Sequence, residues 1–276
     1  MKKLLFIPAI LMTMFFSSCS EEGESQADLE TQFDLESEAT IDANYEDVDD
    51  IVDASFASLS ENGRVAEDEM LDGATVTHDR DNNIITIDYG TGVEGPGGRI
   101  RKGVIVITYS DLRWIPGAFR QVTFEDFSID DVKVEGTRRL ENTAETTEDN
   151  PEFTVTLVGG MLTFTDSTTA TREVNKVRTW NRAANPINDE VSVTGTAGGS
   201  RRDGATYSVE ILEPIVYKRD CRRARVFIPV SGIKQITSGE NVMIVDYGDG
   251  ECDNVATITI NGGEPQDRDL RLRGRR

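Results

Sequence analysis

The stretch FRQVTFEDFSIDDVKVEGTRRLEN (Phe119–Asn142) decides the fold class of this 276-residue chain. Apolar and polar residues alternate along much of it, the period-two pattern of a strand with one buried and one wet face. Asp130 and Asp131 separate the two alternating runs, and this pair is typical of a tight hairpin turn. The stretch therefore predicts two antiparallel strands joined by a short connection.

The same pattern extends from Ala74 toward the C-terminus, in runs such as RKGVIVITYS, EFTVTLV, MLTFTDS, ATYSVEIL and VATITI. Further hairpin turns are expected at Asp81–Asn83, Gly159–Gly160 and Arg202–Gly204. Because no long helical pattern intervenes, parallel crossovers are not expected. We predict an all-β domain over residues 70–276, with about twelve to fifteen strands in a large antiparallel meander that closes into a sandwich or a barrel-like sheet.

One N-terminal amphipathic helix is expected over residues 40–63. Its apolar residues recur at spacings of three and four: Ile41, Tyr45, Val48, Val52, Phe56 and Leu59. Its acidic residues form an outer face: Asp42, Glu46, Asp49, Asp50 and Asp53. A helix lying on a membrane normally carries Lys or Arg there, so we expect this one to pack on the β domain.

The first twenty residues, MKKLLFIPAILMTMFFSSCS, have the layout of a secretory signal peptide over residues 1–18. The segment before Cys19 resembles a bacterial lipoprotein cleavage site, which implies a lipid on the Cys19 thiol. Several acyl chains would anchor the protein lastingly in a membrane. The alternative is an ordinary signal peptide with an incidental cysteine.

Ser20, Glu21 and Glu22 follow the cysteine directly and resemble the surface-export signal of Bacteroidota lipoproteins. The resemblance implies an outer-membrane protein that faces the cell exterior, whereas a plain acidic tether would leave it in the periplasm. Residues 19–39 are acidic and poor in apolar side chains. We expect the lipidated cysteine and a disordered tether in this segment.

The formal charge of −21 restricts the partners of the protein. Binding to nucleic acid needs clustered Lys and Arg, and adsorption to anionic lipid needs the same, so no nucleic-acid partner is expected. Basic residues do cluster at Lys218–Arg225 and at Arg268–Arg276. We expect them to offset acidic strands or the acidic helix, with a dedicated anion site as the alternative.

Two cysteines, Cys221 and Cys252, remain if Cys19 carries lipid. In an oxidising compartment they favour one disulfide, and a hairpin pairing of their flanking strands would bring them close. The bridge would be worth about 3 kcal/mol in the chain-entropy description. Two separate free thiols are the alternative.

The stretch VDYGDGECDN (Val245–Asn254) resembles a calcium loop because of Asp246, Asp249, Glu251 and Asp253. The spacing of these acids does not match the alternating pattern of an EF-hand loop. An earlier stretch, IDYGTGVEGP (Ile87–Pro96), repeats the Asp-Tyr-Gly part without the extra acids. We therefore expect a strand end that the fold uses twice, with calcium as a weak alternative and no other metal.

The sequence contains no recognisable catalytic motif and no cofactor-binding motif. We therefore expect no catalytic residues and no bound cofactor. His78 is the only histidine and is expected at a solvated turn, and no Ser nucleophile elbow or phosphate-binding loop is present. Trp114 lies beside a Pro-Gly break and is a candidate ligand-binding aromatic, whereas Trp180 is expected to close the core.

Several motifs in order resemble an uncharacterised family of Bacteroidota, flavobacterial-type surface lipoproteins with repeated DYG hairpins. They are TIDYGTG, GPGGRIRKGVIVITY, KVEGTRRLEN, NPEFTVTLVGGMLTFTD, VTGTAGGSRRDGATYSVEI and VDYGDGECDNVATITI. The resemblance covers about residues 70–262 and implies an all-β fold and a lipid anchor, but no activity. Members often have a cysteine where Val93 stands, so this chain lacks any thiol chemistry at that position.

The expected function is that of a lipid-anchored outer-membrane lipoprotein of the binding or envelope-assembly type, without catalysis. Its partners would be the membrane, through Cys19, and a glycan or an envelope protein. The alternative is a glycan-directed enzyme or accessory subunit that uses carboxylates and aromatics, since a carboxylate pair can hydrolyse glycosides. A purely structural envelope lipoprotein is a third reading.

Overall fold

A computed structural model of the chain describes residues 35–60, 69–146 and 150–270. Cys19, Ser20, Glu21, Glu22 and the predicted signal peptide lie outside the described residues, as does the side chain of Leu59. Most of the predicted tether and the basic end of the chain from residue 271 also lie outside them.

The described residues form one α-helix, three short 3₁₀ helices and fourteen strands. The helix is α2 (Leu35–Ser60), and the 3₁₀ helices are η1 (Pro96–Gly98), η2 (Pro186–Asn188) and η3 (Asp220–Ala224). The first seven strands are β1 (Thr75–Asp79), β2 (Ile84–Asp88), β3 (Val93–Glu94), β4 (Ile100–Tyr109), β5 (Phe119–Ile129), β6 (Val132–Asn142) and β7 (Glu152–Thr163). The others are β8 (Thr169–Asn181), β9 (Glu190–Ser200), β10 (Thr206–Lys218), β11 (Ser231–Ser238), β12 (Asn241–Asp249), β13 (Val255–Ile260) and β14 (Gln266–Asp269).

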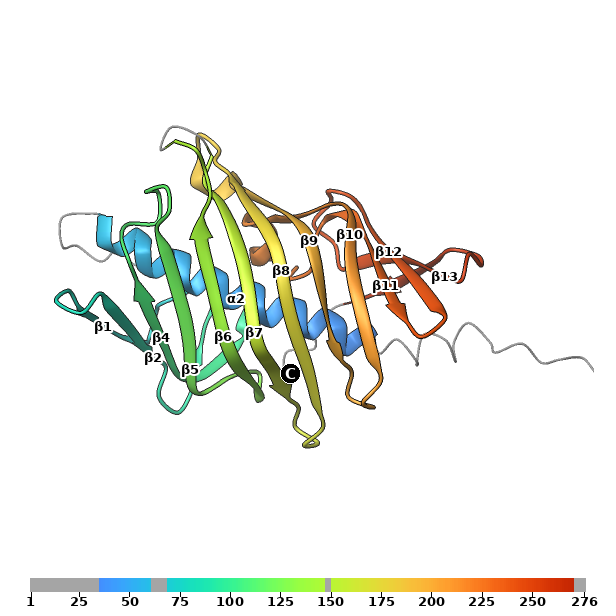
Figure 1. Cartoon of the computed structure of the whole chain (residues 1–276), viewed down its shortest axis with the longest axis horizontal. Helices are drawn as coiled ribbons and strands as arrows, with labels where there is room; N and C mark the ends of the chain where they lie inside the picture. The colour runs from blue at the N-terminus through green and yellow to red at the C-terminus, as the bar shows by residue number, and fades with distance from the viewer. Residues whose placement is uncertain (1–34, 61–68, 147–149, 271–276) are drawn as a thin grey trace, which may run out of the picture.

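All fourteen strands belong to a single antiparallel sheet in chain order, with the short β3 paired beside β4 (Figure 1). The predicted antiparallel meander is thus confirmed. The predicted closure is wrong, because the sheet neither closes into a barrel nor divides into two packed sheets. Helix α2 covers one face of the sheet and buries the residues that a second sheet would otherwise have to cover.

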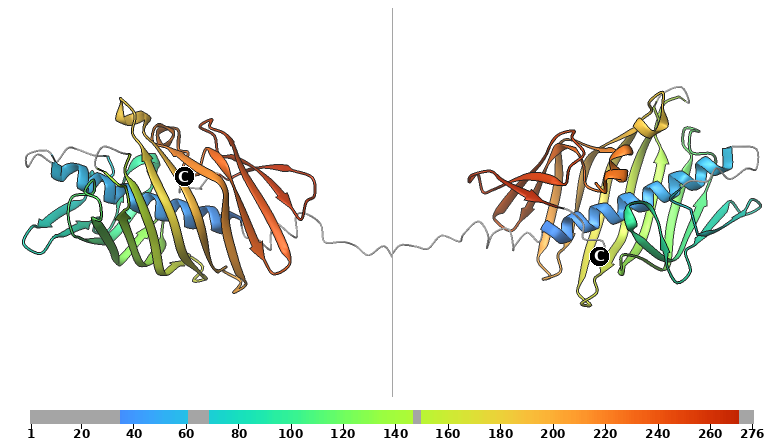
Figure 2. Two further views of the ribbon diagram at one scale, coloured as in Figure 1. Left: turned by 45° about the horizontal axis from the view of Figure 1, so that its top comes forward. Right: turned by 180° about the vertical axis from the view of Figure 1, so that it is seen from behind.

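Helix α2 runs across the strands on one side of the sheet, as the view from behind shows (Figure 2). Its early residue Glu38 contacts β11, and its later residue Asp53 contacts β5. The predicted apolar stripe is buried from Ile41 to Phe56, and it joins residues of β2 and β4 to β8 in one core cluster. Strands β9 to β13 form the main part of a second cluster. Among the described residues, no helix is long and apolar enough to cross a membrane.

The acidic side of the helix is not an outer face, contrary to the sequence-based expectation. Asp49 is 1% exposed and Glu46 is 7% exposed, because arginines on the inner face of the sheet contact them. The helix also begins at Leu35, inside the segment assigned to the tether. Glu38 is buried there against Arg172 and Lys234. Composition alone could not reveal these buried basic partners.

Bulges in the long strands accompany the curvature of the sheet around the helix. The expected hairpin turn at Gly159–Gly160 is wrong, since both residues lie inside β7, where the pairing with β8 shifts register. Gly159 has a φ of 63°, which glycine adopts without strain. Gly136 in β6 faces this bulge, and a Cβ on it would lie 2.8 Å from the Gly160 Cα. The turns at Asp81–Asn83, Asp130–Asp131 and Arg202–Gly204 do join successive strands, as expected.

The two Asp-Tyr-Gly stretches make the same local turn, as the repeat predicted, but only the first lies at the end of its strand. Strand β2 ends at Asp88, whereas β12 continues to Asp249, although its pairing with β13 ends at Asp246. The Asp88 carboxylate accepts a hydrogen bond of 2.7 Å from the Gly90 N–H. The Asp246 carboxylate accepts one of 2.9 Å from the Gly248 N–H. Both glycines have positive φ, and the tyrosines between them are buried at 2% and 4% exposure.

Candidate functional site

A layer of buried ion pairs joins helix α2 to the inner face of the sheet. Arg138 of β6 donates two hydrogen bonds of 2.6 Å to the Asp49 carboxylate, a bidentate pair. Arg101 of β4 binds Asp47 in the same way, at 2.8 and 2.7 Å. Alternating strand positions place these arginines on the face that carries the buried apolar residues.

Two buried carboxylates of this layer, those of Asp42 and Asp47, remain ionised because their basic partners outweigh the effect of burial. Burial by itself would raise the pKa of Asp47, but the charges of Arg101 and Arg99 lower it to about 2. For Asp42, burial acts in the same upward direction, while Lys176, Lys234 and Arg172 hold the pKa well below its ordinary value. Asp42 and Asp47 therefore carry their negative charges at neutral pH.

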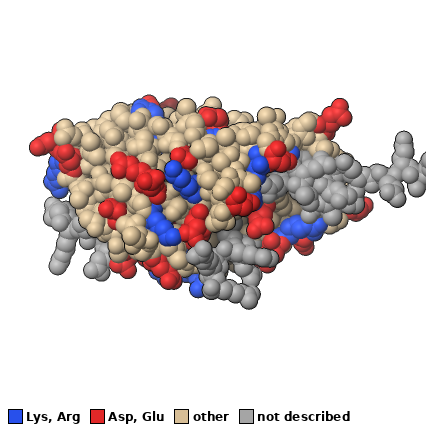
Figure 3. Space-filling model, turned by 90° about the horizontal axis from the view of Figure 1, so that it is seen from below, with Lys and Arg blue, Asp and Glu red and all other residues tan. Residues whose placement is uncertain are grey.

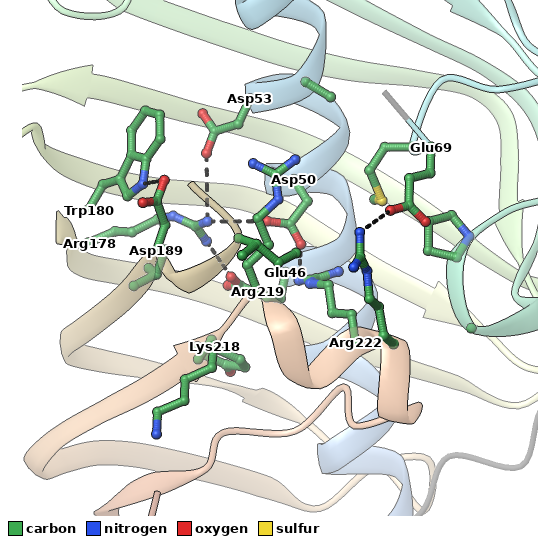
Figure 4. Close-up of a pocket in the computed structure, with 18 of the residues that line it drawn as sticks. Glu46, Asp50, Asp53, Glu69, Arg178, Trp180, Asp189, Lys218, Arg219 and Arg222 are labelled. Carbon is green, nitrogen blue, oxygen red and sulfur yellow. Dashed lines mark hydrogen bonds and ion pairs between the residues drawn. The ribbon is translucent and has the colours of Figure 1, made fainter. Parts of the chain in front are cut away.

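The layer borders a pocket with about 980 Å³ of space not filled by protein atoms, its mouth included. The C-terminal half of α2, the end of β8, the start of β9 and the end of β10 with η3 form its walls. Figure 4 shows the Arg178 guanidinium between the carboxylates of Asp53, Asp50 and Glu46. The pocket is thus where the inner face of the sheet becomes accessible.

Charged residues of both signs line the pocket. The acids are Glu46, Asp50, Asp53, Glu69 and Asp189. The bases are Arg113, Arg178, Lys218, Arg219, Arg222 and Arg223. The Lys218 side chain turns away from the others in Figure 4, and its amine donates to the Gly250 carbonyl at 2.7 Å. With Lys218 turned away, the lining carries five arginines and five acids.

Trp180 forms one wall of the pocket and is held by two contacts. Its indole Nε1–H donates a hydrogen bond of 2.9 Å to the Asp189 carboxylate. The Arg113 guanidinium lies 4.2 Å from the ring centre, a cation–π contact. The half-buried indole is thus fixed in orientation at the pocket wall, rather than closing the core as the sequence suggested.

Asp53 binds two arginines beside this wall. Its carboxylate lies 2.6 Å from Arg120 and 3.3 Å from Arg113. Burial would raise the pKa of Asp53, but Arg120, Arg113 and Arg178 lower it to about 2. A carboxyl group with so low a pKa holds no proton to donate at neutral pH.

The short helix η3 brings Arg222 and Arg223 to the pocket, Arg219 directly precedes it, and a disulfide holds it. Cys221 lies in η3, is 1% exposed and is bonded to Cys252 in the β12–β13 connection, with 5.1 Å between their Cα atoms. Arg222, the next residue, pairs with Asp50 of the helix, so the basic cluster Lys218–Arg225 does offset acids of α2. The sequence offered no signal that η3 and Trp180 share a pocket.

Other residues that the sequence singled out lie elsewhere. Trp114 is half-buried in the β4–β5 connection and does not line the pocket, although its neighbour Arg113 does. His78 lies near the end of β1, beside the hairpin turn as expected, and its Nε2 is 2.6 Å from the Tyr109 hydroxyl. Burial is the main cause that lowers the pKa of this imidazole.

The four acids of the weak calcium alternative do not assemble into a site. Within residues 35–60, 69–146 and 150–270, the one group of three metal-ligating types is Asp220 with Cys221 and Cys252. Both cysteines of that group are in the disulfide. Asp246 and Asp253 instead accept hydrogen bonds from nearby backbone N–H groups.

One face of the molecule carries charges of both signs in small groups. On the face that Figure 3 shows, the described Lys and Arg side chains lie among Asp and Glu and are separated by uncharged atoms. A surface that binds nucleic acid would present clustered Lys and Arg instead. The face in Figure 3 therefore shows no such cluster of described Lys and Arg side chains.

Comparison of the chain with protein-family models, curated proteins and solved structures finds no match. The pocket has therefore to be interpreted from its own geometry.

Proposed function

We propose that the protein is a lipid-anchored outer-membrane lipoprotein that faces the cell exterior and binds a small saccharide in the pocket beside Trp180. The anchor and the export signal rest on the sequence around Cys19 and Ser20–Glu22. The observation that carries the binding function is the pocket itself, with its fixed indole and converging charged groups.

A saccharide fits the chemistry of this lining. Sugars present many hydroxyl groups, each of which donates and accepts hydrogen bonds, and the lining offers charged groups of both kinds. They also present an apolar C–H face, for which an aromatic wall is a favourable contact. Ligand sites of proteins commonly combine aromatic side chains with a few placed polar groups.

Binding without turnover is favoured over glycoside hydrolysis by the state of the carboxylates. A glycosidase needs one carboxyl group with a raised pKa as general acid. Here Asp53 has its pKa lowered, Glu46 lies 2.6 Å from Arg178, and Asp189 accepts from Trp180 and from the Ala183 N–H. These carboxylates serve to fix their neighbours.

The anchor is tested by replacing Cys19 with serine. We expect the variant to leave the membrane fraction for the soluble fraction, because its acyl chains are lost. The Cys252→Ser variant is the control and should stay with the membrane. A Cys19→Ser protein that still sediments with membranes would contradict the anchor, and full protection of the native protein from protease on intact cells would contradict its exposure.

The binding function is tested by fluorescence, since the chain has only two tryptophans. In the Trp114→Phe variant all tryptophan emission comes from Trp180. We expect titration with a panel of monosaccharides and oligosaccharides to give a saturable change for at least one of them. Trp180→Ala should weaken binding of the same saccharide at least about tenfold by calorimetry, through the lost aromatic contact.

The Trp114→Ala variant is the matched control and should bind as the native protein does. A panel without any saturable response would contradict the proposed function. If Trp114→Ala abolished binding and Trp180→Ala did not, the site would lie at the β4–β5 connection instead. Release of new reducing ends during the titration would establish the hydrolase alternative.

A further inference from the structure

The Arg178 side chain has a buried donor group, Nη2, that makes no hydrogen bond within the described protein. Its Nη1 donates to Glu46 at 2.6 Å and to Asp49 at 3.3 Å. Its Nη2 makes no hydrogen bond to any described residue, although the side chain is only 3% exposed. A buried donor left without an acceptor costs about 1–3 kcal/mol, more for a charged group, so an acceptor from outside the protein would be stabilised there.

The nearest carboxylates do not supply that acceptor. Asp50 Oδ1 and Asp53 Oδ2 lie 3.6 and 3.7 Å from Arg178 Nη2, which are charge contacts beyond hydrogen-bond length. Each of these carboxylates has a closer arginine: Asp50 pairs with Arg222, and Asp53 pairs with Arg120. The negative charges around Nη2 are thus already compensated by other groups.

The charges toward the mouth also favour an anion. Helix η3 places Arg222 and Arg223 along the pocket, and Arg219 precedes them, whereas Glu69 is the exposed acid of this side. Arg219 and Arg223 are exposed and Arg222 is half-buried, so this side of the pocket offers three guanidinium groups to an anion. A guanidinium and a carboxylate both carry charge, whereas a hydroxyl is neutral, so a carboxylate gains Coulombic attraction from this donor that a hydroxyl does not.

We infer that the pocket selects an acidic sugar, a uronic acid, whose carboxylate accepts a hydrogen bond from Arg178 Nη2. The inference rests on the proposed function and specifies its ligand class. The sugar ring then lies toward Trp180, since Trp180 lies two residues after Arg178 at the end of β8 and lines the same pocket. The neutral hydroxyls contact the remaining polar lining.

The native protein tests this without any risk to folding. We expect calorimetric titration to show that glucuronate binds at least about tenfold more tightly than glucose, and than the methyl ester of glucuronate. The preference should shrink as the salt concentration rises. Equal affinity for the three sugars, or tighter binding of glucose, overturns the inference but leaves the proposed function standing. Absence of binding by every saccharide of the panel overturns both.

Two variants test whether the carboxylate of the bound sugar contacts Arg178. Arg178→Lys, confirmed as folded by urea unfolding, should abolish the preference for glucuronate over glucose, because a single ammonium group does not reproduce the planar donor geometry. Arg219→Gln, at an exposed position of the lining, should weaken glucuronate binding severalfold more than it weakens glucose binding. Arg139→Gln is the matched control, since Arg139 pairs with Glu141 and does not line the pocket. An unchanged glucuronate preference in both Arg178→Lys and Arg219→Gln would overturn the inference.

Discussion

Replacing Asp49 with alanine is expected to lower the free energy of unfolding by about 3–5 kcal/mol. Asp49 is 1% exposed and accepts both hydrogen bonds of the Arg138 guanidinium. Its loss leaves a buried guanidinium facing the space vacated by the carboxylate, and an unpaired buried charge is costly. The measurement is equilibrium unfolding in urea, followed by circular dichroism, at neutral pH.

Glu141→Ala is the matched control for that variant. Glu141 pairs with Arg139, which immediately follows Arg138 in β6, but these two side chains are 44% and 36% exposed. An exposed pair contributes about 0–1 kcal/mol, so this variant should unfold nearly as the native protein does. If the two variants had equal stabilities, the ion-pair layer would contribute nothing particular to the fold.

Replacing Cys221 and Cys252 together with serine is expected to lower the free energy of unfolding by about 3 kcal/mol. The bond links residues 31 positions apart, and its loss gives the unfolded chain more freedom. It also releases η3 from the β12–β13 connection, so we expect weaker ligand binding as well. Urea unfolding and calorimetric titration of the same samples give both quantities.

A reductant distinguishes the effect of losing the disulfide from the effect of replacing the two cysteines. Dithiothreitol should shift the unfolding midpoint of the native protein to that of the double-serine variant, and should leave the variant unchanged. Mass spectrometry after thiol alkylation shows how much of the bond is reduced. A fully reduced native protein with an unshifted midpoint would refute the stabilising role of the bond.

The strands could be predicted from the sequence because the alternation of apolar and polar residues is a local property. The antiparallel order of the strands could be predicted because the connections between them are short. Whether the sheet closes into a barrel could not be predicted, because this depends on what covers the inner face of the sheet. A signal for the answer was nevertheless present. Arg138 shares its face of β6 with the buried Val134 and Leu140, and Arg172 shares its face of β8 with the buried Val174.

The partners of these arginines also left a pattern on the helix. The acids at 42, 46, 49 and 53 repeat at the helical spacing, one residue beyond the apolar stripe. A stripe of acids beside a buried stripe, together with arginines in the buried phase of strands, predicts a charged helix–sheet interface. The acidic stripe and the arginines each resemble ordinary surface charge when considered alone. Composition therefore favoured a solvent-exposed acidic face of the helix.

The candidate pocket could be predicted least, since it combines side chains from distant segments. Trp180 ends a strand, and its neighbours in the pocket come from α2, the β4–β5 connection and η3. Nothing in the residues around Trp180 indicates these neighbours. The Asp-Tyr-Gly repeat gave a correct prediction of the local turn because its contacts, from Asp88 to Gly90 and from Asp246 to Gly248, lie within three residues of sequence.

The position of helix α2 also sets the order in which the molecule can be completed. The sheet pairs strands that follow one another along the chain, so it can grow hairpin by hairpin during synthesis. The helix is synthesised first, yet its residue Glu38 pairs with Lys234, which lies 196 positions later in the sequence. Until β11 exists, one end of the helix lacks its basic partners, and contacts of such long range slow folding. On the proposed export route, this delay would keep the chain unfolded while it crosses the inner membrane, and docking of the helix would complete the fold beyond it.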